Sequence, residues 1–139
     1  MEKSHVRISK PLKSTSVYTK YPAGFKFNGK AVLNLGCGFA KFDAANVINL
    51  DAYDNCSPQV VWDLAKMPMP FPDESFDFII ANHIFEHVPD WWKCFEDCAR
   101  VLKTGGSMEI WLPGNGSDSQ LGYRDHINLI NQCSFLANL

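Results

Sequence analysis

Residues 33–51, "LNLGCGFAKFDAANVINLD", decide the fold class of this 139-residue chain. The stretch opens on an apolar run that ends in glycine and closes on a second apolar run that ends in an acid. Such short, continuous apolar runs are typical of strands buried on both faces of a parallel sheet. Gly36 and Gly38 allow a sharp turn and a close backbone approach to a ligand, because neither has a Cβ. The stretch therefore predicts a strand, a glycine turn and a second strand with Asp51 at its carboxyl end.

The rest of the sequence continues this pattern. Strands are predicted at 30–36, 46–51, 59–64, 75–83 and 107–113. A helix is predicted after Asp90, which suits an N-cap, with Gly105 and Gly106 as its stop. Strands joined by crossovers indicate an α/β domain with a parallel sheet. Ligands of such sheets bind at the carboxyl ends of the strands, so the polar residues that follow the strands mark the predicted site.

Composition and charge indicate one globular domain with a different N-terminal segment. The chain is 46% hydrophobic and 20% charged, and no apolar run approaches the roughly 18 residues that span a bilayer. Residues 1–30 carry seven Lys/Arg and one acid, whereas residues 31–139 carry six bases and fourteen acids. We expect a basic extension over residues 1–28, either solvated or in contact with nucleic acid or an anionic surface, and a folded domain over 29–139.

Cysteine usage and the N-terminus predict a cytoplasmic location. The five cysteines are odd in number and form no C-x-x-C pair, so no disulfide framework is expected and a reducing compartment fits. The first thirteen residues lack the apolar core of a secretory signal.

One pentapeptide, His83-Ile84-Phe85-Glu86-His87, has the H-x-x-E-H spacing of a class of zinc peptidases. That site needs both histidines on one continuous helix and a third ligand downstream. His83 instead closes a predicted strand, and the downstream candidates are Glu96 on the helix and Glu109 within a strand. The sequence favours a turn that Glu86 anchors, and no metal ligand is assigned.

The glycine turn also resembles part of a dinucleotide fingerprint. The full fingerprint is G-x-G-x-x-G/A, and its sixth position here is Lys41, which weakens the nicotinamide interpretation. An acid at the end of the next strand is nevertheless placed to accept hydrogen bonds from a ribose diol. Together, the turn and Asp51 predict a nucleoside site.

Five ordered features resemble the class I S-adenosylmethionine-dependent methyltransferases with an L-E-H-like motif, over residues 31–113. They are the glycine loop "VLNLGCG", Asp51, Asp63-Leu64, the turn "NHIFEHV", and "CARVLKTGG" followed by "SMEIWLP". The resemblance implies a Rossmann-like, doubly wound, mostly parallel sheet and S-adenosyl-L-methionine as cofactor. The cofactor-binding residues that it implies are Leu35, Gly36, Cys37, Gly38, Asp51, Ala52, Asp63, Leu64, Asn82 and His83.

The implied reaction is methyl transfer to a small-molecule or sugar-type acceptor. Asn82-His83-Ile84 is not the Asn-Pro-Pro-Tyr type of motif that methylases of nucleobase amino groups use, so a nucleic-acid acceptor is disfavoured. A hydroxyl acceptor would benefit from a general base. His87 and His126 are the candidates, and each is equally interpretable as a packed or surface histidine.

The chain departs from the family pattern in three ways. Ala40 replaces the usual third glycine, and only twelve residues separate Gly38 from Asp51, so the usual first helix is expected to be short or replaced by a loop. About five strands are present, whereas the usual strands six and seven are missing. The C-terminal part is therefore expected to be incomplete. The alternatives to an active enzyme are a catalytically inactive cofactor-binding relative, or a homo-oligomeric scaffold whose partner covers an open sheet edge.

Overall fold

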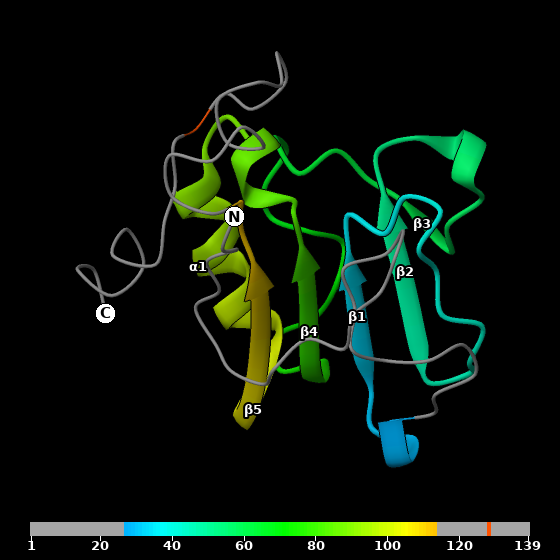
Figure 1. Cartoon of the computed structure of the whole chain (residues 1–139). Helices are drawn as coiled ribbons and strands as arrows, with labels where there is room; N and C mark the ends of the chain where they lie inside the picture. Colours follow the sequence, from blue (N-terminus) through cyan, green and yellow to red (C-terminus); the bar gives the residue numbers. More distant parts are fainter. Residues whose placement is uncertain (1–26, 114–127, 129–139) are drawn as a thin grey trace.

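The sheet of this computed structural model, which describes residues 27–113 and 128, has five parallel strands (Figure 1). They are ordered β3-β2-β1-β4-β5, and each pairs in parallel with its neighbour. Their bounds are β1 (Val32–Leu35), β2 (Val47–Asp51), β3 (Val60–Val61), β4 (Phe76–Asn82) and β5 (Leu102–Trp111). The predicted α/β class and number of strands are confirmed. The strand order reverses between β1 and β4, which is the switch point where open α/β sheets bind ligands.

The helix α1 (Trp91–Val101) begins where the sequence predicted. The Asp90 side chain accepts a hydrogen bond from the backbone N–H of Lys93 at 3.5 Å, as an N-cap does. Within the described residues, no helix is long and apolar enough to cross a membrane.

The predicted helix stop at Gly105 and Gly106 was wrong. The helix ends at Val101, and β5 begins directly at Leu102. Phe76 pairs with Leu102 and Phe78 with Ser107, so β5 carries extra residues opposite Asp77. Gly105 has φ +80°, and a Cβ at Gly106 would lie 2.9 Å from the Asp77 carbonyl oxygen. The two glycines therefore shape a bulge in the strand.

Two further elements differ from their predicted extents. Residues 36–46 form no helix, which confirms that a loop replaces the usual first helix. β3 is shorter than predicted, because the chain turns after Val61. The Asp63 carboxylate accepts a hydrogen bond from the N–H of Ala65 at 2.9 Å, and the Trp62 indole N–H donates to the Lys66 carbonyl at 2.7 Å. Short 3₁₀ helices occur at η1 (Phe27–Gly29), η2 (Asp54–Cys56) and η3 (Phe85–His87).

A hydrophobic cluster lies on each face of the sheet, because alternate strand residues point to opposite faces. Leu33 and Ile79 join the larger cluster, with Cys98 of α1, whereas Val32 and Ile80 join the smaller one. The smaller cluster includes Phe27 and Phe42, whose rings meet edge to face at 5.2 Å. Burying a large apolar side chain of this kind contributes about 1.5–3 kcal/mol.

Buried amides hold the loop that replaces the first helix. Asn49, which is fully buried in β2, accepts hydrogen bonds from the Asn34 amide at 2.9 Å and the N–H of Phe42 at 3.0 Å. It also donates to the Phe42 carbonyl at 2.9 Å and to the Gln59 side chain at 2.8 Å. These hydrogen bonds therefore fix the path of the loop after the glycine turn, which has no helical hydrogen bonds of its own.

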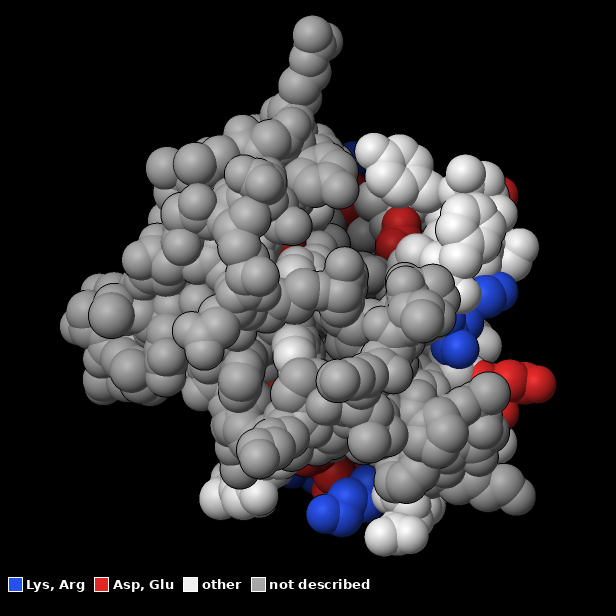
Figure 2. All heavy atoms as spheres, in the orientation of Figure 1, with Lys and Arg blue, Asp and Glu red and all other residues white. Residues whose placement is uncertain are grey.

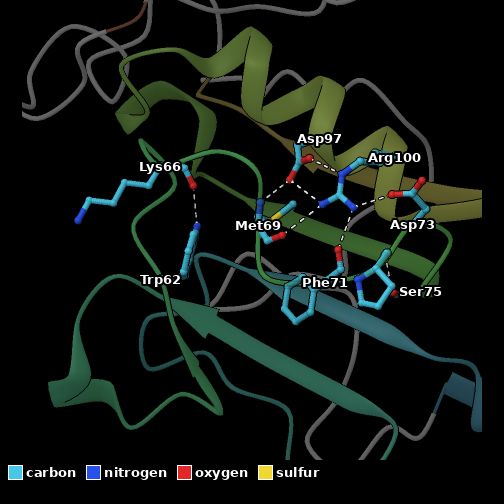
Figure 3. Close-up of polar contacts among 9 residues, drawn as sticks. Trp62, Lys66, Met69, Phe71, Asp73, Ser75, Asp97 and Arg100 are labelled. Carbon is cyan, nitrogen blue, oxygen red and sulfur yellow. Dashed lines mark hydrogen bonds and ion pairs between the residues drawn. The ribbon is translucent and has the colours of Figure 1, made fainter.

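Arg100 of α1 holds the segment that leads into β4 (Figure 3). Its guanidinium donates to Asp97 at 2.6 Å, to Asp73 at 2.8 Å, and to the carbonyls of Phe71 and Met69. Asp97 in turn accepts a hydrogen bond from the N–H of Met69 at 2.7 Å. The hydrogen bond with Asp97 raises the pKa of Arg100 above its ordinary value, and the bond with Asp73 adds to this effect.

Candidate functional site

A cavity of about 610 Å³ opens at the carboxyl edge of the sheet. This volume falls within the range of small-molecule sites. Residues that follow β1, β2, β3 and β4 all line the cavity, so the switch point of the sheet is where it lies. In the space-filling view, acidic atoms are visible in a hollow near the ends of β1 and β2 (Figure 2). We call this cavity the cleft.

The glycine turn after β1 forms one wall of the cleft. Gly36 and Gly38 have φ values of +62° and +50°, a region that other residues adopt only with strain. A Cβ on Gly36 would collide with the side chain of Ile84, whereas a Cβ on Gly38 would meet no atom within 4 Å. Gly36 therefore permits close packing of the chain, and Gly38 leaves space beside the cleft.

Asp51 fixes the turn from the end of β2. Its Oδ2 accepts a hydrogen bond from the N–H of Gly38 at 2.8 Å, and its Oδ1 accepts one from the N–H of Tyr53 at 3.0 Å. Each carboxylate oxygen can accept a further hydrogen bond. The carboxylate is thus oriented and retains capacity to bind the hydroxyl groups of a ligand in the cleft.

The segment after β4 forms the opposite wall. His83 has φ +52°, and its N–H donates to the Trp111 carbonyl at 3.0 Å, which ties the turn to β5. Its ring Nδ1 lies 3.2 Å from Oε1 of Glu86, a carboxylate that is only 1% exposed. Glu86 therefore anchors the turn, as the sequence predicted. His83 and His87 both line the cleft.

The geometry does not assemble the zinc-peptidase arrangement from His83 and His87. His83 follows a strand and His87 ends a short 3₁₀ helix. Among residues 27–113, the three ligand-type side chains close enough to hold an ion are Cys37, Asp51 and Cys56, and this group includes neither histidine.

Most of the predicted site residues lie together. Those that line the cleft are Gly36, Gly38, Asp51, Ala52, Asp63, Leu64, His83 and His87. Leu35 is fully buried in β1, and Cys37 and Asn82 line a smaller cavity of about 40 Å³. His126 lies outside the described residues.

Sequence reasoning missed several residues of the cleft. The two large exposed ones are Phe39, 80% exposed, and Tyr53, 72% exposed; the others are Asn55, Cys56, Ala65, Ile84, Val88 and Pro89. Tyr53 follows Asp51 by two residues, and Phe39 follows Gly38 directly. Nearness to a strand exit is the signal that could have identified both rings.

Burial and neighbouring groups affect the thiols. The four described cysteines are free and buried. Burial, and then the neighbouring Cys56 and Asp51, raise the pKa of the Cys37 thiol to about 12. Contact with Cys94, followed by burial, raises the pKa of Cys98 on α1 well above its ordinary value.

Comparison with known proteins identifies the family. A family model described as a methyltransferase domain matches residues 33–110. The chain belongs to this methyltransferase family. Methyltransferases of the family use S-adenosylmethionine, so the resemblance read from the sequence is confirmed.

Two solved structures show the same fold. A chain of the complex between the Haloferax volcanii Trm112 methyltransferase activator and a methyltransferase has a TM-score of 0.64 and 18% identity, over 78% of this chain and 58% of that one. A methyltransferase of Bacillus halodurans has a TM-score of 0.61 and 21% identity, over 78% and 59%.

Curated relatives are longer proteins with different acceptors. Sterol 24-C-methyltransferase of Aspergillus fumigatus is 30% identical over 125 residues, which cover 73% of this chain and 33% of the relative. The 27-O-demethylrifamycin SV methyltransferase of Amycolatopsis mediterranei is 40% identical over 53 residues, 37% of this chain and 20% of the relative. The trans-aconitate 2-methyltransferase of Rhizobium rhizogenes is 29% identical over 98 residues, 60% and 38%. This chain therefore spans about a fifth to two-fifths of these relatives' length.

Proposed function

We propose that this chain binds S-adenosylmethionine in the cleft and transfers its methyl group to a small-molecule acceptor. The observation that carries the proposal is the contact between the Gly38 N–H and the Asp51 carboxylate at the wall of the cleft. The contact orients an acid toward the space that Gly38 leaves open, where a nucleoside ribose requires an acceptor of hydrogen bonds. Family membership supports the same assignment.

The residues of the cleft suit each part of this cofactor. The Asp51 carboxylate would accept hydrogen bonds from the ribose hydroxyls, and the glycine turn would lie against the methionyl part. Asp63 and Leu64, which line the cleft, would offer a carboxylate and a buried aliphatic side chain to the adenine. The exposed rings of Phe39 and Tyr53 supply aromatic surface at the same cleft, and their burial by a ligand would favour binding.

Catalysis then depends on how the chain positions the acceptor. When bound, the cofactor supplies a methyl group that its sulfonium already activates. Holding two reactants in line can lower a barrier by about 7–11 kcal/mol. His83, held by Glu86, is a positioning residue of the wall. His87 is the candidate that would take a proton from a hydroxyl acceptor, a role that contributes about 10²–10⁴-fold.

The names of three relatives support a small-molecule acceptor. A sterol, a rifamycin precursor and trans-aconitate are the acceptors that three relatives' names give. All three are small molecules, so the proposal for this chain is limited to that class.

Thermal unfolding with S-adenosylmethionine and S-adenosylhomocysteine tests the cofactor site. A ligand at 100 times its dissociation constant stabilises a fold by about 2.7 kcal/mol. We expect both nucleosides to raise the midpoint of the wild type and of Asp43→Asn, an exposed acid that does not line the cleft. Asp51→Asn should abolish the rise while it keeps side-chain volume. No rise in the wild type would contradict the proposed cofactor.

Turnover separates an enzyme from an inactive relative. The assay offers a radiolabelled cofactor and a panel of small alcohols, acids and sterols. We expect transfer of the labelled methyl group to at least one of them. Cofactor binding without transfer to any of them would favour a relative that binds but does not catalyse. For an active acceptor, His87→Ala should lower turnover by at least about 10²-fold if His87 is the base; a loss below about threefold would remove that role.

A further inference from the structure

Two thiols and a carboxylate converge beside the cleft. The Sγ atoms of Cys37 and Cys56 and a carboxylate oxygen of Asp51 all lie within 4.8 Å of one another. Both thiols are only 4% exposed. The three residues come from the glycine turn, from the end of β2 and from η2, so two separate loops bring the thiols together.

Backbone contacts fix each of the three groups. The N–H of Cys37 donates to the Leu50 carbonyl at 2.9 Å, and the Cys56 thiol contacts the Tyr53 carbonyl at 3.0 Å. Asp51 is held by the hydrogen bonds from Gly38 and Tyr53. The arrangement is therefore built into the turn and η2.

The three groups have the ligand chemistry of a zinc site, and separations of at most 4.8 Å are compatible with one. Thiolate, imidazole and carboxylate are the ligands of Zn²⁺, with Zn–S near 2.3 Å. Two sulfur atoms of such a tetrahedron lie about 3.8 Å apart, which is within the observed limit of 4.8 Å. Mg²⁺ and Ca²⁺ prefer ligand sets made of oxygen atoms. Because Cys56 and Asp51 line the cleft, a fourth position would open toward it and be available to water.

We propose that Cys37, Asp51 and Cys56 bind a thiophilic divalent cation such as Zn²⁺, and that this cation and the nucleoside exclude each other at Asp51. Binding replaces the proton of each thiol with a metal–sulfur bond and releases both protons to solvent, with no change of oxidation state. Two thiolates and one carboxylate leave a complex of net charge −1. The nearby Lys41 ammonium, which donates to the Ser57 carbonyl at 3.0 Å, lies beside the same loop and favours this charge.

The exclusion rests on the proposed function, whereas the cation site does not. The cation and the ribose would both bind the Asp51 carboxylate. An Asp51 oxygen bonded to the metal could not accept a hydrogen bond from the ribose. Metal availability would then regulate the cofactor site directly.

Titration of the reduced 139-residue chain with Co²⁺ in the absence of oxygen tests the cation site. Co²⁺ replaces Zn²⁺ in tetrahedral sites, and thiolate ligands give it charge-transfer absorption, which Zn²⁺ should then displace. We expect one Co²⁺ per chain. Cys37→Ser and Cys56→Ser should each reduce the absorption and weaken Co²⁺ binding more than about 100-fold. Loss of a group that only hydrogen-bonds to a metal ligand already lowers metal affinity by up to about 100-fold. Asp51→Asn should weaken binding and keep the thiolate absorption.

Matched controls distinguish this site from the other cysteines. Cys94→Ala removes a thiol buried on α1, and Cys133→Ser removes the cysteine outside the described residues; both should keep the spectrum. The unfolding midpoint of each variant without metal shows whether it folds. The absence of thiolate absorption in the wild type, or its persistence in both Cys37→Ser and Cys56→Ser, would overturn the site.

A second titration tests the exclusion. Coupling between two ligands is reciprocal, so S-adenosylhomocysteine should weaken Co²⁺ binding by the same factor by which Co²⁺ weakens nucleoside binding. Independent binding of both would overturn the exclusion. If the chain binds no nucleoside at all, the proposed function fails, while the cobalt spectrum and its loss in the two serine variants still decide the cation site.

Discussion

Gly36 and Gly38 belong to the same turn and both have a positive φ, yet they have different structural roles. Gly36 faces the side chain of Ile84, which follows β4, so its missing Cβ lets two strand exits pack together. Gly38 faces open space and donates its N–H to Asp51. The first residue therefore supports packing, and the second shapes the ligand side of the turn.

Alanine at the two positions should separate these effects. Both variants bear the left-handed strain of about 1–2 kcal/mol. Gly36→Ala should lose more stability than Gly38→Ala, because its Cβ also displaces the partly buried Ile84, and overpacking typically costs about 1–3 kcal/mol. Gly38→Ala should bind S-adenosylhomocysteine more weakly than its loss of stability alone explains. Urea unfolding and calorimetric titration measure the two quantities; equal losses of stability would contradict the assignment.

At the scale of elements, Arg100 attaches the segment between β3 and β4 to helix α1 (Figure 3). The guanidinium bridges two carboxylates and two backbone carbonyls, and a planar fork with several donors suits such a set. Arg100 belongs to the "CARVLK" stretch on which the family resemblance partly rests. The structural reason for an arginine there is the docking of the helix.

Arg100→Lys should therefore destabilise the fold although it keeps the charge. A lysine ammonium cannot contact all four partners, and Asp97, which is 8% exposed, would lose part of its pairing. Under-satisfied buried groups cost about 1–3 kcal/mol, and urea unfolding should show a loss of that size. As a control, Lys93→Ala breaks an exposed pair with Asp90 and should change stability by under about 1 kcal/mol. Equal effects would argue against the docking role.

The loop between β1 and β2 depends on Asn49 in a similar way. Asn49→Leu replaces a fully buried amide that bonds Asn34, Phe42 and Gln59. It leaves several buried partners unsatisfied, each at about 1–3 kcal/mol. We expect a loss of several kcal/mol in urea unfolding and weaker nucleoside binding, because the glycine turn lies on this loop. Asn46→Ala, at a half-buried residue whose amide donates to the Lys30 carbonyl at the surface, should cost under about 1.5 kcal/mol. A stable variant with unchanged affinity would contradict this account.

The sequence predicted elements better than it predicted their ends. Five strands followed from apolar runs, and Asp51, Asp63 and His83 followed from strand exits. The helix stop failed because Gly105 and Gly106 are typical of a helix end locally, whereas pairing with β4 makes them a bulge. Pairing across the sheet is not visible in a local pattern. The Cys37 and Cys56 contact was missed for the same reason, since the paths of two loops determine it.

At the scale of the whole molecule, the two edges of the sheet serve different purposes. The carboxyl edge holds the cleft, with Asp51 and His83 among its walls. The opposite edge holds acids that accept hydrogen bonds from neighbouring segments. Asp77 accepts one from the N–H of Ala31 at 2.9 Å, and Glu74 accepts two from Thr104. These bonds connect the starts of β1, β4 and β5, far from the cleft.

The acids of the opposite edge should make stability dependent on pH. The bond from Ala31, and then the nearby Lys103, lower the pKa of Asp77, and the bonds from Thr104 lower that of Glu74. A carboxyl whose pKa is lower in the folded state stabilises the fold fully above its unfolded pKa, about 3.9 for Asp and 4.3 for Glu. That contribution is lost as the pH falls through the lowered folded values.

Asp77→Asn tests this sign and the separation of the two edges. The amide oxygen can still accept from Ala31, but it does not titrate. The variant should be less stable than the wild type near neutral pH, and the difference should shrink as the pH falls below about 4, because the wild-type carboxyl then takes up its proton. Urea midpoints across this pH range measure the difference, with Asp43→Asn as a charge control. Affinity for S-adenosylhomocysteine at neutral pH should stay unchanged. A difference independent of pH would show that Asp77 acts through shape alone, and a loss of affinity would show that the two edges are coupled.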